Sequence, residues 1–166
     1  MQNALKAEAR GDREVVVMRE FKAPRQLVWD AHTKPELVKR WMLGPDGWSM
    51  PVCEMDVRVG GKYRWRWKSD ENGQEFGFFG EFREVNAPAK IVHTEYFDQG
   101  DLEQQNEFPA GEPAIITQEY SEANGRTLLT TIMLFASKES RDGAVATGMT
   151  DGMEIGYKRL DEMFAK

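Results

Sequence analysis

The chain has 166 residues, of which 40% are hydrophobic and 30% are charged, and its formal net charge is -6. These values are ordinary for a globular domain with a sizeable core. The negative charge argues against a general nucleic-acid binder, which needs a basic surface to release counterions from phosphates. No apolar run approaches the roughly 20 residues that span a bilayer. We therefore expect a cytoplasmic protein with neither a membrane nor a nucleic acid as its partner.

The N-terminal segment mixes charged residues with few apolar ones and lacks the apolar stretch of a signal peptide. We predict a flexible tail over residues 1–13 and a single domain over residues 14–166. Glu14–Phe21 is rich in β-branched residues, which predicts a first strand. Proline favours the first turn of a helix, so Pro24 and Pro35 indicate two short helices. These helices are predicted over Gln26–His32 and Glu36–Met42.

Further strands are predicted over Met50–Val59, Lys62–Lys68, Glu75–Val85, Lys90–Phe97, Ala114–Ser121 and Thr127–Phe135. The pair Asn124-Gly125 is typical of a tight hairpin turn between the last two. The polar stretch Asp98–Pro113 predicts a long loop. A C-terminal helix is predicted over Arg141–Ala165, capped by Ser137 or Ser140. Because strands and helices are segregated along the chain, the predicted fold class is α+β.

Three glycines recur at every fourth residue of the predicted C-terminal helix, at positions 148, 152 and 156. Each helical glycine costs about 1 kcal/mol relative to alanine, so the three together cost roughly 3 kcal/mol. Close packing of another element on this face is one interpretation, with Met149 and Met153 as adaptable filler. The other interpretation is that this face forms the wall of a ligand cavity.

An aromatic ladder marks the strand Lys62–Lys68, where Tyr63, Trp65 and Trp67 share one face. We expect these rings to face the C-terminal helix. The intervening basic residues would then be solvated; they are Arg64, Arg66 and Lys68. The rings either fill a core or leave uneven gaps that suit a small molecule.

His93 and Glu95 share one face of their predicted strand. If that face points inward, the pair can orient a ligand or act as acid and base. In the alternative the pair is solvated, and the residues that point inward are Val92, Thr94 and Tyr96. Arg19 shares a face with Phe21 and is predicted to pair with a carboxylate that the sequence does not identify.

The chain has two histidines and one cysteine, Cys53, which argues against a zinc site with nitrogen and sulfur ligands. Neither a glycine-rich phosphate loop nor a nucleophile elbow occurs. Cys53 falls inside a predicted strand, where thiols are usually inert. We therefore predict no metal, no cofactor and no catalytic residue.

A set of segments carries a family resemblance: Arg19–Phe21, Ala23–Trp29, Thr33–Leu37, Trp41, Asp56–Gly61, Gly80–Phe82, Gly125–Thr130 and Gly148–Leu160. Together they resemble the START-like (SRPBCC) superfamily, in the branch of bacterial proteins similar to the C-terminal domain of the activator of heat-shock protein 90 ATPase. The resemblance covers about residues 14–164. It implies a helix-grip fold, in which a curved antiparallel sheet wraps the C-terminal helix, often around a hydrophobic cavity. Members include lipid, hormone and polyketide binders, aromatic-ring cyclases and chaperone regulators, so the fold does not settle the function.

Three functions follow as hypotheses. The first is non-catalytic binding of an apolar or aromatic small molecule by a monomer or weak homodimer. The second is interaction with a chaperone, as a regulator of its ATPase. The third is an enzyme of the cyclase or hydrolase type that uses His93 and Glu95. The predicted ligand-binding residues are Trp41, Met55, Trp65, Trp67, Phe79, His93, Glu95, Met149, Gly152 and Met153.

Overall fold

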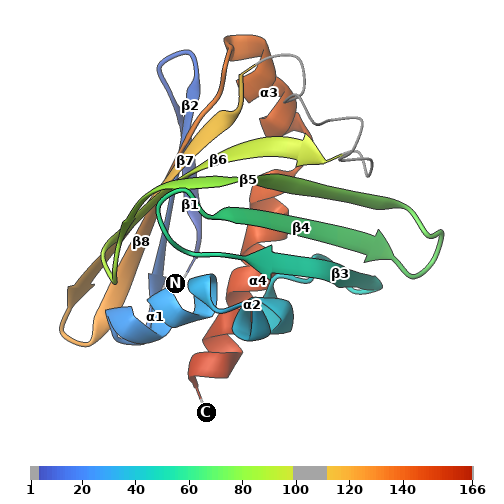
Figure 1. Cartoon of the computed structure of the whole chain (residues 1–166). Helices are drawn as coiled ribbons and strands as arrows, with labels where there is room; N and C mark the ends of the chain where they lie inside the picture. Colours follow the sequence, from blue (N-terminus) through green and yellow to red (C-terminus); the bar gives the residue numbers. More distant parts are fainter. Residues whose placement is uncertain (1–3, 99–111, 166) are drawn as a thin grey trace.

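The computed structural model describes residues 4–98 and 112–165, in which a strongly curved sheet surrounds a C-terminal helix (Figure 1). Among these residues, eight antiparallel strands form one sheet in the order β1-β2-β8-β7-β6-β5-β4-β3. The strands are β1 (Lys6–Arg10), β2 (Glu14–Phe21), β3 (Trp48–Met55), β4 (Lys62–Ser69), β5 (Glu75–Asn86), β6 (Lys90–Asp98), β7 (Ala114–Ala123) and β8 (Arg126–Leu134). The predicted α+β class and helix-grip arrangement are confirmed. Most of the predicted loop Asp98–Pro113 lies outside the described residues.

The helices are α1 (Arg25–Thr33), α2 (Pro35–Trp41), α3 (Lys138–Ala146) and α4 (Met149–Phe164). Pro24 stands at the N-cap of α1 and Pro35 in the first turn of α2, which confirms the two short helices. In Figure 1 these two helices lie together at one end of the sheet, beside α4. The β7–β8 turn has positive φ angles at Asn124 and Gly125, as a two-residue hairpin turn requires.

The prediction of a flexible N-terminal tail is wrong for Lys6–Arg10. These residues form β1, an edge strand that pairs with β2 along its whole length. Every side chain of β1 is exposed, so the strand is held by main-chain hydrogen bonds, which leave no hydrophobic pattern in the sequence. Just before β1, the Leu5 amide donates a hydrogen bond to a carboxylate oxygen of Glu154 on α4, at 2.7 Å.

The predicted C-terminal helix is also corrected, because it is two helices rather than one. Gly148 separates α3 from α4 and adopts a φ of 80°. This left-handed conformation is unfavourable for residues that have a Cβ atom, and glycine has none. Gly148 therefore breaks the helix, and of the three regularly spaced glycines only those at 152 and 156 carry a helical propensity cost, about 2 kcal/mol together. At the start of α3, the Ser137 hydroxyl accepts a hydrogen bond from the Ser140 amide at 3.0 Å, which confirms that cap.

The two glycines within α4 differ in their surroundings. A Cβ atom on Gly156 would lie 3.2 Å from Cε3 of the Trp41 ring, whereas a Cβ atom on Gly152 would meet no atom within 4 Å. The sequence left close packing and open space as competing interpretations of the glycine face. Close packing applies at Gly156 and open space applies at Gly152.

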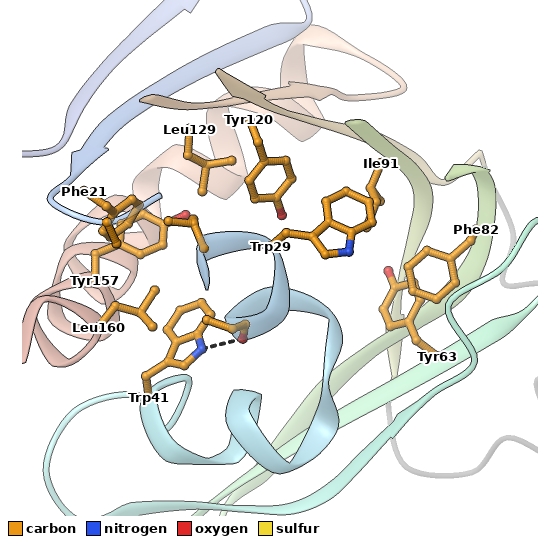
Figure 2. Close-up of a cluster of buried hydrophobic side chains, with 13 residues drawn as sticks. Phe21, Trp29, Trp41, Tyr63, Phe82, Ile91, Tyr120, Leu129, Tyr157 and Leu160 are labelled. Atoms are coloured by element: carbon orange, nitrogen blue, oxygen red, sulfur yellow. Dashed lines mark hydrogen bonds between the residues drawn. The ribbon is translucent and has the colours of Figure 1, made fainter. Parts of the chain in front are cut away.

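The main core cluster joins the inner face of the sheet to α1, α2 and α4 (Figure 2). Trp41 is 3% exposed, and its indole N–H donates to the Ala31 carbonyl at 2.8 Å, the hydrogen bond drawn in Figure 2. On α4, the Tyr157 ring meets Phe21 of β2 edge-on, with ring centroids 5.3 Å apart. Aromatic contacts of this kind fix how close α4 lies to the sheet.

Arg19 fastens α4 to β2 from inside the fold. Its side chain is almost fully buried and pairs with Glu154 at 2.9 Å and with Asp161 at 2.7 Å, both on α4. The carboxylate partner that the sequence did not identify is therefore a pair of residues two turns of helix apart. Because a buried guanidinium needs both partners in place, this contact sets the rotation of α4 about its axis.

The outer face of the sheet holds a second set of ion pairs. Asp98 is fully buried and pairs with Arg64 at 2.7 Å and with Arg66 at 3.0 Å. The prediction that Arg66 is solvated is therefore wrong, since its exposure is 7%. Gly77 lies between Arg66 and Asp98 in the strand register, and its missing side chain lets the two residues meet across β5. Lys68 is exposed, as predicted.

Candidate ligand-binding site

The aromatic ladder of β4 faces the interior, as predicted. Tyr63 and Trp67 are buried, Trp65 is half-buried, and the Tyr63 and Trp65 ring centroids lie 4.5 Å apart. The Trp67 indole N–H donates to the Met42 carbonyl at 2.7 Å. The Trp65 indole N–H is buried and has no acceptor among the described residues. An unsatisfied buried donor costs about 1–3 kcal/mol, so Trp65 offers a hydrogen bond that the described residues leave unused.

His93 lies on the same inner face, opposite Phe82 of β5. It is 4% exposed, and its ring centroid lies 4.9 Å from that of Tyr63 and 6.1 Å from that of Trp65. Of the two orientations that the sequence left open, the structure shows the one in which the His93 face points inward. Burial lowers the pKa of His93 to about 4, so the imidazole is neutral at physiological pH.

Hydrogen bonds around His93 decide which ring nitrogen carries the proton. The Tyr63 hydroxyl donates to the Thr94 carbonyl at 2.5 Å, so its oxygen is left to accept. Nδ1 of His93 lies 3.1 Å from both the Tyr63 hydroxyl and the Thr94 carbonyl. Because both of these groups accept, Nδ1 must be the donor. The other nitrogen, Nε2, is therefore an acceptor.

Glu95 follows His93 on the inner face and is half-buried. Burial raises the pKa of its carboxyl group to about 7, and the Glu95 charge also raises the pKa of Tyr63, after the larger effect of burial. Desolvation disfavours the charged form of a carboxyl group, so the side chain of Glu95 is partly withdrawn from water on this face. No described residue donates a hydrogen bond to the Glu95 side chain, so its acceptor capacity is also unused.

A glycine on the neighbouring strand makes room for this arrangement. The register places Gly80 of β5 opposite Glu95, between the pairs Phe79–Tyr96 and Phe82–His93. A Cβ atom at Gly80 would lie 2.1 Å from the Thr94 carbonyl oxygen. Glycine is therefore required if the strands are to approach closely enough for the Tyr63 hydroxyl to reach that carbonyl. In the sequence, Gly80 stands out only as part of a segment that carries the family resemblance, and Tyr63 was not among the predicted ligand-binding residues.

The opposite wall comes from α4. Met153 is half-buried and packs against the main core cluster, and Met149 packs against a second cluster formed by Val15, Val17, Ile116 and Met133. Between them, Gly152 leaves open space. Met55 of β3 packs against both the main cluster and the group around Trp67. Trp65, Met55 and Met153 thus pack against the same core cluster, and the His93 ring contacts Trp65. Glu95 follows His93 on the inner face of β6, and Met149 and Gly152 lie in the first turn of α4.

Three other predicted residues take different places. Trp41 and Trp67 belong to the packed core, and both indole N–H groups are bonded to main-chain carbonyls. Phe79 is on the wrong side of the sheet: it stacks on Tyr96 across the outer face, with ring centroids 5.3 Å apart and planes at 20°. The run Glu75–Phe82 has phenylalanines on both faces, so alternation alone could not assign it. The strand register shows that Phe76, Phe78 and Phe82 are the inward rings.

Three further properties bear on the kind of site. Within residues 4–98 and 112–165, no three His, Cys, Asp or Glu side chains are placed to hold a metal ion. None of the helices in those residues is long and apolar enough to cross a membrane. Burial raises the pKa of Cys53 to about 11, so this thiol is not activated as a nucleophile.

A curved antiparallel sheet that wraps a C-terminal helix, with two short helices after its first long strand, is the arrangement of START-like (SRPBCC) domains, which typically bind ligands. The chain belongs to the family described as activator of Hsp90 ATPase homolog 1-like protein, whose model matches residues 22–165.

Solved structures with the same fold come from several bacteria. A protein from Rhodobacter sphaeroides has 25% sequence identity and a TM-score of 0.83, with 98% of each chain covered. A Nitrosomonas europaea protein has 25% identity and a TM-score of 0.76, covering 93% of this chain and 95% of its own. A Mycobacterium smegmatis protein has 18% identity and a TM-score of 0.82, with coverage of 95% and 94%. The search of curated proteins gave no match.

Proposed function

We propose that this protein binds an apolar or aromatic small molecule between the inner face of the sheet and α4. One observation carries the proposal: the Trp65 indole N–H is buried on an aromatic face, and no residue that the structure describes accepts a hydrogen bond from it. Small-molecule sites are typically apolar recesses with a few polar groups that fix orientation. The rings of β4, the methionines of α4 and the space beside Gly152 supply the apolar part. Trp65, His93 and Glu95 supply the polar part.

Binding accounts for these features without catalysis. His93 has one ring nitrogen engaged by Tyr63 and Thr94, which orients the ring for a fixed contact. Glu95, with a pKa near 7, has the proton affinity of a general acid or base, so enzymatic use of this pair stays a prediction. An unused donor next to unused acceptors is also what a ligand with complementary polar groups requires, and this simpler role needs no reaction.

The experiment uses two aromatic residues on opposite faces of the sheet. The purified protein is examined by native mass spectrometry for retained compounds and then titrated with a panel of aromatic and lipid metabolites. Trp65→Phe removes the indole N–H and part of the ring, whereas Phe79→Leu alters an outer-face ring as a matched control. We expect Trp65→Phe to weaken binding severalfold, consistent with the loss of about 0.5–1.5 kcal/mol for one hydrogen bond, and Phe79→Leu to leave it unchanged. Equal effects of both variants, or no binding to any compound, would contradict the proposal.

A second candidate is regulation of a chaperone ATPase through the outer face. The family description favours it, and the stack of Phe79 on Tyr96 presents half-buried aromatic surface there. The same two variants separate the candidates in the opposite direction. In a pull-down and ATPase assay with the heat-shock protein 90 of the source cell, Phe79→Leu should reduce the effect and Trp65→Phe should preserve it. No binding and no change in ATPase rate would remove this candidate.

A further inference from the structure

We infer that the ligand of this site carries a basic nitrogen, which the side chains of Glu95 and His93 bind as a protonated amine while the surrounding rings cover its apolar body. The inference rests on the proposed function and names the chemical class of its ligand. Its support comes from the hydrogen-bonding capacity that the inner face leaves unused and from the aromatic surface around it.

The first support is a carboxylate without a cation. The change in the pKa of Glu95 is caused by burial alone, with no contribution from a positive residue. The arginines of β4 are engaged on the opposite face, where Arg64 and Arg66 pair with Asp98. Arg19 is held by its two carboxylate partners on α4. A partly desolvated carboxylate is stabilised most by a positive group that also donates hydrogen bonds, and none of the described side chains supplies one.

The second support is the tautomer of His93. Since Nδ1 donates to the Tyr63 hydroxyl and the Thr94 carbonyl, Nε2 accepts. The strand β6 therefore presents two acceptors at alternate positions, a carboxylate and an imidazole nitrogen, on one face. An ammonium group has up to three N–H donors and no acceptor. It satisfies both side chains at once, which a carbonyl or ether oxygen cannot do.

The third support is the aromatic surface next to these acceptors. Tyr63 and Trp65 lie 4.5 Å apart between ring centroids, and both contact the His93 ring. Cations are attracted to the faces of aromatic rings, most strongly to tryptophan. The net charge of -6 also favours a cationic ligand over an anionic one during approach. The indole N–H of Trp65, which has no acceptor within residues 4–98 and 112–165, then donates to an acceptor elsewhere on the same ligand.

The test compares three probes that share one ring system and differ in charge: 1-naphthylmethylamine, 1-naphthalenemethanol and 1-naphthoic acid. Binding is measured by isothermal titration calorimetry at neutral pH on the full chain and on two variants. Glu95→Gln removes the inner carboxylate and keeps its shape. Glu81→Gln, on the outer face of the adjacent strand, removes the same charge from the sheet and serves as the control. The thermal unfolding midpoint of each variant is measured alongside to confirm that it is folded.

We expect the amine to bind at least about tenfold more tightly than the alcohol, because a charge-assisted hydrogen bond contributes enough affinity for that factor. The acid should bind most weakly. Glu95→Gln should remove the preference for the amine, and Glu81→Gln should retain it. Equal binding of amine and alcohol, or a preference that survives Glu95→Gln, overturns this inference and leaves the proposed function standing. Binding of none of the three probes overturns the proposed function and the inference together. Glu95→Gln should not lower the unfolding midpoint, because it removes a desolvated charge.

Discussion

Replacing Gly152 with alanine should stabilise the fold, whereas the same change at Gly156, one turn further along α4, should destabilise it. An alanine methyl at position 152 meets no atom within 4 Å, so the variant gains about 1 kcal/mol of helix propensity at no steric cost. For a chain of this length, that gain raises the unfolding midpoint by about 2–4 °C.

At position 156 the methyl would lie 3.2 Å from Cε3 of the Trp41 ring and 3.4 Å from its main-chain oxygen. Trp41 cannot easily give way, because its indole N–H is bonded to the Ala31 carbonyl and its ring packs against His32 and Tyr157. Overpacking of this kind costs typically about 1–3 kcal/mol, which meets or exceeds the propensity gain.

Urea denaturation of the wild type and both variants gives the free energies of unfolding directly. The expected order is Gly152→Ala above the wild type and Gly156→Ala at or below it, with the two variants separated by at least about 1 kcal/mol. A destabilised Gly152→Ala would show that the space beside α4 is filled, and would refute the reasoning. The same variant reports on function, since a methyl group in the ligand's space should weaken binding.

Acid should destabilise the protein, because burial lowers the pKa of His32 and of His93 to about 4. Between pH 6.5 and pH 4, the two histidines therefore bind protons in the unfolded chain but not in the folded protein. Stability should hold above pH 6.5 and fall toward pH 4 by about 3 kcal/mol per histidine. Glu95 acts in the opposite sense, since its raised pKa favours the fold at low pH and disfavours it as the pH rises toward 7. Urea midpoints from pH 7.5 to 4.5 should therefore fall more steeply in Glu95→Gln than in the wild type, and parallel curves would count against a desolvated carboxyl group. Arg19→Met should lower the free energy of unfolding by up to about 3 kcal/mol, because it leaves two carboxylates on α4 unpaired. If a calorimetric scan shows no loss of stability, aromatic packing alone positions the helix.

The sequence predicted the inner face of β4 correctly because its pattern is unambiguous. Tyr63, Trp65 and Trp67 alternate with basic residues, and only one face can be buried against α4. The same alternation failed in β5, where Phe78 and Phe79 are adjacent and both aromatic. There the strand register decides, and register depends on pairings with β4 and β6 that no local pattern contains.

Other features were missed because they depend on the main chain or on distant pairs. The strand β1 was predicted as a tail, since its charged side chains all face solvent and its backbone alone pairs with β2. Gly148 looked like one of three equivalent helical glycines, and only its φ angle shows that it ends α3. The burial of Arg66 needed Asp98 on a strand that is not its direct neighbour. Spatial neighbours of this kind are invisible to two-residue periodicity.

The attachment of α4 to β2 affects which residues of this fold can mutate without loss of structure. The helix is held to β2 through Glu154 and Asp161, while the positions that border the proposed ligand are 149, 152 and 153. Attachment and recognition thus use separate residues of one helix. Mutation, natural or designed, can exchange the recognising residues and leave the anchor intact, so ligand preference in this fold can diverge while α4 stays attached to β2.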